Sequence, residues 1–74
     1  MKTYNGHRSW NAWNVALWIG NDEGLYHFAL DCLNGRNISQ ATKTFMRDLG
    51  STRTPDGATY NYTCVMEALK GLRD

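Results

Sequence analysis

The side chains best suited to hold a metal ion in this sequence are two histidines and two cysteines. Structural zinc sites use these residue types in closely spaced pairs, and no such pair occurs here. The two that share a predicted helix are five positions apart and therefore point about 140° apart around it. We expect no zinc site and no cofactor. The four residues are His7, His27, Cys32 and Cys64.

A second arrangement with chemical potential is His27, which has a carboxylate four residues to either side, Glu23 and Asp31. On a helix this spacing places all three side chains on one face, where the carboxylates favour the charged imidazolium. That face is expected to be solvated, which weakens the effect. The sequence contains no nucleophile elbow and no glycine-rich phosphate-binding loop. Because no set of residues meets the requirements of an active site, we predict that the protein is not an enzyme.

The formal net charge is only +1, but the charges are unevenly distributed. Residues 21–34 contain acids and no Lys or Arg, whereas residues 36–53 contain four basic residues and a single acid. Four basic charges would bind nucleic acid weakly and in a salt-dependent manner. Separate acidic and basic faces suit a protein partner better, and nucleic-acid binding stays open as an alternative. The basic residues are Arg36, Lys43, Arg47 and Arg53.

Residues 10–20 are predicted to form a helix that is apolar on almost every side, with Ser9 as its N-cap. The one polar sector holds Asn11 and Asn14, and Trp18 falls within it. A helix of this kind is either buried or covered by a partner, and a short chain has little material to surround it. Trp18 is therefore either an exposed interface residue or a core residue beneath a loop. Self-association of the helix is a further alternative.

Three more helices are expected, at about residues 22–34, from Asn37 or Ser39 to residue 49, and at about residues 61–72. Apolar residues at helical spacing, among them Tyr26, Met46 and Tyr62, are expected to face inward. Residues 1–8 are expected to be extended. Pro55-Asp-Gly57 predicts a turn, within either an irregular loop or a β-hairpin in residues 51–63. The sequence thus predicts an all-α fold, a small four-helix domain that spans residues 1–74.

The N-terminal sequence MKTYNGHRSW is polar and does not have the pattern of a signal peptide. No apolar run is long enough to span a membrane. We therefore expect a protein of the cytoplasm. In that reducing compartment Cys32 and Cys64 are expected to be free thiols, the alternative being a single disulfide.

Two segments in the first third of the chain carry a resemblance to a known group of proteins. Tyr4-Asn-Gly6 and the sequence WNVALWIGNDEGLY at residues 13–26 resemble a family of small uncharacterised proteins from bacteriophages and mobile elements. The resemblance implies a phage origin and a location in the cytoplasm of the bacterial host, and it transfers no active site. Small phage accessory proteins commonly act stoichiometrically by binding a host protein, as anti-CRISPR and anti-restriction proteins do.

We therefore predict a phage-encoded, non-catalytic inhibitor that binds a host protein, such as a component of an antiviral defence complex. One alternative is a small accessory protein that binds DNA or RNA. The other is a structural phage protein that forms a homo-oligomer. The residues expected to contact the host protein are Asn11, Asn14, Trp18, Arg36, Lys43, Arg47 and Arg53.

Overall fold

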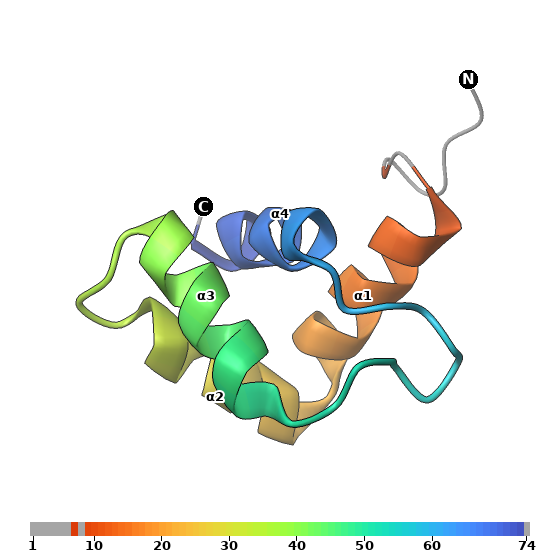
Figure 1. Ribbon diagram of the computed structural model, residues 1–74, viewed down its shortest axis with the longest axis horizontal. Coiled ribbons are helices and arrows are strands. Elements are labelled where there is room, and N and C mark those ends of the chain that lie inside the picture. The colour runs from red at the N-terminus through yellow and green to blue at the C-terminus, as the bar shows by residue number, and fades with distance from the viewer. Residues whose placement is uncertain (1–6, 8, 74) are drawn as a thin grey trace.

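The computed structural model describes residue 7 and residues 9–73, and this part of the chain forms four helices. The predicted all-α fold is therefore confirmed. In Figure 1, α1 and α3 lie on opposite sides of the molecule, with α2 and α4 between them. Each of α2 and α4 packs against both α1 and α3, whose backbones do not come close to one another. The helices are α1 (Trp10–Asn21), α2 (Glu23–Leu33), α3 (Ile38–Leu49) and α4 (Tyr62–Arg73).

A single residue, Asp22, joins the first two helices. Its backbone N–H donates to the carbonyl oxygen of Trp18 at the end of α1, at 2.9 Å. Its side-chain Oδ2 accepts from the backbone N–H of Leu25 at 2.9 Å and so caps the start of α2. α1 itself begins at Ser9, whose Oγ accepts from the N–H of Ala12 at 3.1 Å. Side-chain oxygens of this kind satisfy the backbone donors that a helix start leaves without partners.

The other two helices begin at caps too, and in both of them the capping residue is an asparagine. Asn37 and Gln40 form a reciprocal capping box at the start of α3, and this arrangement satisfies two backbone donors at once. α3 ends at Gly50, whose φ of 75° lies in the left-handed region that favours glycine. At the start of α4, Asn61 Oδ1 accepts from the backbone N–H of Cys64 at 2.9 Å. The boundaries expected from these residue types agree with the structure to within one or two positions.

One apolar core holds the helices together. Phe45 of α3 is fully buried, and its ring lies 5.0 Å from the ring of Phe28 and 6.2 Å from that of Tyr60, measured between centroids. Burying each large apolar side chain contributes about 1.5–3 kcal/mol relative to leaving it in water. The other large apolar side chains with no exposed surface are Val15 and Ile19 of α1 and Val65 and Leu69 of α4.

The loop between α3 and α4 turns back on itself at Pro55-Asp-Gly57, as its sequence predicts. The N–H of Thr54 donates to the carbonyl oxygen of Ala58 at 2.8 Å. Next to this bond, Arg53 and Thr59 form an isolated antiparallel bridge. No strand forms within residues 51–61. The expectation of an irregular loop followed by a helix is therefore confirmed, and the hairpin alternative survives only as this single bridge.

Three side chains expected on inward-facing apolar surfaces are exposed, and for them the prediction was wrong: Tyr26 of α2, which is 36% exposed, Met46 and Tyr62. Met46 is 37% exposed, because α3 turns the adjacent Phe45 toward the core. Tyr62 is 38% exposed, and its hydroxyl lies 3.0 Å from Ser39 Oγ. Tyr62 occupies the first turn of α4, where its ring reaches across the surface to α3. The predicted extended segment falls outside the described residues, apart from His7.

Both cysteines are buried free thiols, in agreement with the expectation. Among residues 9–73, no helix has the length and apolar character needed to cross a membrane.

Candidate functional site

The polar sector of α1 binds the loop between α3 and α4. Asn14 is 2% exposed, and its Nδ2 donates to Asp56 Oδ2 at 2.9 Å. Its Oδ1 accepts from Thr54 Oγ1 at 2.6 Å. Trp18 Nε1 donates to the same Asp56 oxygen at 2.9 Å. Three hydrogen bonds thus join two side chains of α1, Asn14 and Trp18, to two side chains of the loop, Thr54 and Asp56.

Asn11 extends this attachment by pairing with the backbone of the loop. Its Nδ2 donates to the carbonyl oxygen of Thr59 at 2.9 Å, and its Oδ1 accepts from the N–H of the same residue at 2.7 Å. Asn11 and Asn14 therefore hold the loop against α1. The prediction that Asn14 contacts a partner does not fit this arrangement, because the loop covers Asn14 and leaves it only 2% exposed.

Trp18 combines the two alternatives that its sequence position left open. It is half-buried and bonded to the loop, but it also lines a surface hollow together with Leu17, Asn21 and Asp22. The hydrogen bonds from Asn14 and Trp18 lower the pKa of Asp56. Asp56 is therefore ionised at neutral pH and places a negative charge beside the Trp18 indole.

The predicted basic residues are mostly engaged within the chain. Arg36 Nη1 donates to the carbonyl oxygens of Asp31 and Cys32 at the end of α2, each at 3.3 Å. Arg47 pairs with Asp48 at 2.9 Å; both groups are exposed, so this ion pair adds little stability. The remaining two are Arg53, whose Nη1 donates to the carbonyl oxygen of Gly57 at 3.1 Å, and Lys43, which is exposed on α3.

The seven predicted contact residues do not form one surface. Asn11, Asn14 and Trp18 lie on α1, whereas Lys43 and Arg47 lie on α3, which is on the opposite side of the molecule (Figure 1). The structure brings the α1 residues together around the loop. The basic residues of α3 lie on the other side of α2 and α4 from them (Figure 1).

A further candidate surface is an apolar face of α1, whose residues the helical spacing groups together but which the sequence prediction did not include among the contact residues. Trp10 is 38% exposed and Leu17 is 36% exposed, with the half-buried Trp13 between them. We call Trp10, Trp13 and Leu17 the α1 apolar face. It lies opposite the core-facing side of the helix, which carries Val15 and Ile19. The available signal was that α1 has two apolar faces, although a small domain needs only one of them for its core.

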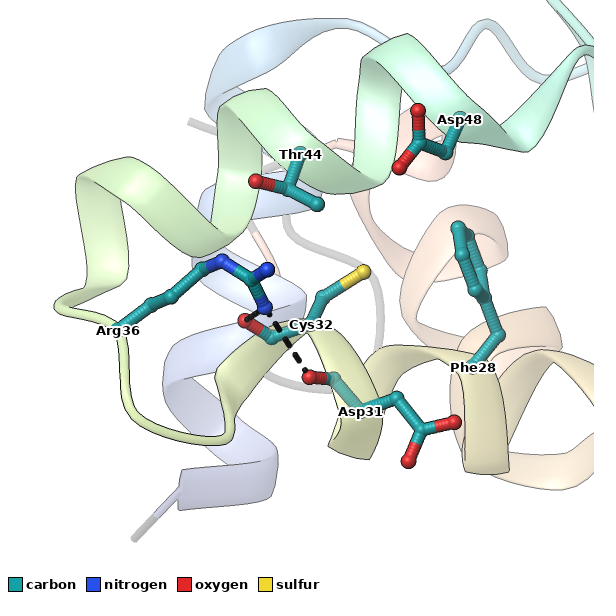
Figure 2. Close-up of a pocket in the computed structure, with 6 residues that line it drawn as sticks. All are labelled: Phe28, Asp31, Cys32, Arg36, Thr44 and Asp48. Carbon is teal, nitrogen blue, oxygen red and sulfur yellow. Dashed lines mark hydrogen bonds between the residues drawn. The ribbon is translucent and has the colours of Figure 1, made fainter.

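A second hollow, of about 280 Å³, lies between α2 and α3 (Figure 2). Burial raises the pKa of the Cys32 thiol. The thiolate is the nucleophilic form of cysteine, so this environment opposes nucleophilic chemistry. The guanidinium of Arg36 is held at the end of α2 by the carbonyls of Asp31 and Cys32. The hollow is lined by Phe28, Asp31, Cys32, Arg36, Thr44 and Asp48.

Within the part of the chain that the structure describes, no group of three His, Cys, Asp or Glu side chains could hold a metal ion. His27 is exposed on α2. The absence of enzymatic activity stays a prediction.

The fold and surface define a small four-helix domain with an apolar face on its first helix and a loop bound along that helix. The chain belongs to DUF7249, a family of unknown function whose model matches residues 1–72. No curated protein and no solved structure matches the chain.

Proposed function

We propose that this protein is a non-catalytic binding domain that docks onto a host protein through the α1 apolar face. The observation that carries the proposal is the exposure of Trp10 and Leu17 on a helix whose opposite side already supplies the core. Trp is among the residue types most enriched where binding energy concentrates in protein interfaces. An apolar face of this kind gains free energy when a partner removes it from water.

We further propose that the protein is phage-encoded and acts in the cytoplasm of the bacterial host. The host protein would be a component of an antiviral defence complex, which the bound domain inhibits. The proposal draws on the resemblance of residues 13–26 to a family of small uncharacterised phage and mobile-element proteins, and on the stoichiometric binding by which small phage accessory proteins commonly act. The chemistry of the α1 apolar face fits such a role because it requires a complementary surface and no reacting group.

Nucleic-acid binding is the weaker candidate. Of the four basic residues expected to form an edge, Arg36 and Arg53 bind backbone carbonyls and Arg47 is paired with Asp48. Among the described residues, Lys43 is then the basic side chain of α3 that forms no hydrogen bond or ion pair. If nucleic acid were the ligand, Arg47→Glu would weaken binding, and raising the salt concentration would abolish it.

The test is affinity capture from a lysate of the bacterial host with the tagged wild type and two matched variants. Leu17→Lys places a charge on the α1 apolar face. Leu30→Lys makes the same change on α2, at a leucine that is 37% exposed against 36% for Leu17. Thermal melting of each variant verifies that it is folded.

We expect one host protein, retained at high salt and in near-equal amount, to bind the wild type and Leu30→Lys but not Leu17→Lys. Equal loss in both lysine variants would contradict docking through the α1 apolar face. Nucleic acid recovered only at low salt would favour the nucleic-acid alternative. Recovery of this chain alone would favour the homo-oligomer.

A further inference from the structure

A small hollow lies beside the α1 apolar face. It is lined by Leu17, Trp18, Asn21 and Asp22 and has a volume of about 330 Å³. This volume is at the lower end of the range of ligand pockets, roughly 300–1,000 Å³. Leu17 belongs both to the hollow and to the α1 apolar face. A protein docked on that face would therefore also cover the hollow.

One carboxylate lines the hollow, and a second is hydrogen-bonded to a residue of its wall. Asp22 forms part of its wall, and Asp56 accepts the indole N–H of Trp18. Each uses Oδ2 for hydrogen bonds within the chain, and among the described residues neither forms an ion pair with a basic group. The N-terminus of α2 offsets part of the charge of Asp22, whereas Asp56 lies in the loop.

The surrounding helices add to this negative potential. Glu23 follows Asp22 at the start of α2, and neither α1 nor α2 contains Lys or Arg. An aromatic ring next to carboxylates without basic partners attracts a cation, both through the charges and through the face of the indole. Closure of a partner over the hollow would exclude water and strengthen both attractions.

We propose that this hollow receives a Lys or Arg side chain that stands beside apolar residues on the protein partner. The inference rests on the proposed docking function, and it specifies the chemistry of the partner. The apolar residues would pack on Trp10 and Leu17, while the basic group would lie beside Asp22 and the Trp18 indole, which is bonded to Asp56. The partner surface is therefore apolar with a basic residue at its edge.

The test is a titration of the ¹⁵N-labelled protein by NMR with n-hexylammonium, which represents a lysine side chain. Hexanoate and hexanol at the same concentration and ionic strength are the comparison probes. The reporters are the Trp18 indole N–H and the backbone amides of Asn21 and Asp22. The Trp10 indole N–H reports on apolar binding outside the hollow.

We expect saturable shifts of the Trp18 and Asn21 signals with hexylammonium and none with hexanoate. Asp56→Asn keeps the shape of the side chain and should weaken hexylammonium binding about fivefold. Asp22→Asn should act in the same direction while keeping the cap of α2. The matched control Asp31→Asn, at the far end of α2, should leave binding unchanged. A dispersed spectrum verifies that each variant is folded.

An equal response to hexylammonium and hexanol, or no saturable response at the hollow, would overturn the proposal. Shifts of the same signals on raising the protein concentration alone would also overturn it, since a second copy of this chain would then occupy the hollow. The titration needs no host protein, so it can fail while capture that depends on Leu17 succeeds. If the titration succeeds but capture does not depend on Leu17, the proposed docking function is wrong and the hollow is a cation site alone.

Discussion

The most demanding prediction concerns Asn14, a buried amide that fastens the α3–α4 loop to α1. Replacing it by Ala removes the bond to Asp56 at 2.9 Å and the bond from Thr54 at 2.6 Å. It also strips the Thr54 hydroxyl of its acceptor at a position that is only 4% exposed. A buried polar group left without a partner costs more than the loss of an average hydrogen bond.

The two lost bonds and the hydroxyl without an acceptor together predict a loss of about 3 kcal/mol in the free energy of unfolding. A domain of this length has a total stability of roughly 4–11 kcal/mol, so Asn14→Ala should remain folded but be markedly destabilised. The matched control is Asn21→Ala, at an exposed residue of the same helix. It should change stability by no more than about 0.5 kcal/mol.

The assay is equilibrium unfolding in urea, followed by tryptophan fluorescence and by far-ultraviolet circular dichroism. Coincident transitions from the two probes would support a two-state treatment. A loss below about 1 kcal/mol for Asn14→Ala would refute the buried network, because it would mean that water satisfies Asp56 and Thr54 equally well.

Three further predictions follow from individual residues. The pKa of Asp56 is lowered in the folded state, so its contribution to stability is present above about pH 4 and is lost as the pH falls through the folded value. Asp56→Asn should therefore flatten the acid limb of the plot of stability against pH, and an unchanged limb would contradict the bonds from Asn14 and Trp18. Gly50→Ala should lower the free energy of unfolding by about 1 kcal/mol, because Gly50 has a φ of 75°. Gly71→Ala should raise it by up to about 1 kcal/mol, because Gly71 lies within α4 and has open space for the added methyl group. Thermal melts of the two variants that shift in the same direction would contradict this pair of predictions. Both cysteines are buried and burial raises the pKa of Cys32, so a water-soluble disulfide reagent should label Cys32 and Cys64 rapidly only in urea, and rapid labelling of the native protein would show that the thiols are accessible.

The helices were predictable because their signals are local. Ser9, Asp22 and Asn37 cap helix starts with bonds that span three residues, and Gly50 ends α3 by its backbone conformation. Such contacts are contained within a short stretch of sequence. The order and extent of the four helices could therefore be derived from residue types and spacing.

The candidate site was harder to predict because its contacts are long-range. Asn14 and Thr54 are 40 positions apart. No local sequence pattern indicates that the α3–α4 loop, which contains Thr54, folds back against α1. Two asparagines on an apolar helix suggested a partner surface, whereas the chain supplies their partners itself. Helical spacing groups Trp10, Trp13 and Leu17 on one face, but only the structure showed that the opposite face forms the core and leaves this one partly exposed.

The central claim is that a host protein docks on the α1 apolar face. The most direct measurement is site-specific photo-crosslinking in living host cells, with benzoylphenylalanine in place of either Leu17 or Leu30. The two leucines are almost equally exposed, at 36% and 37%, and lie on different helices. We predict that the probe at Leu17 crosslinks one distinct host protein and that the probe at Leu30 does not. Equal crosslinking from both positions, or crosslinking from Leu30 alone, would contradict the claim.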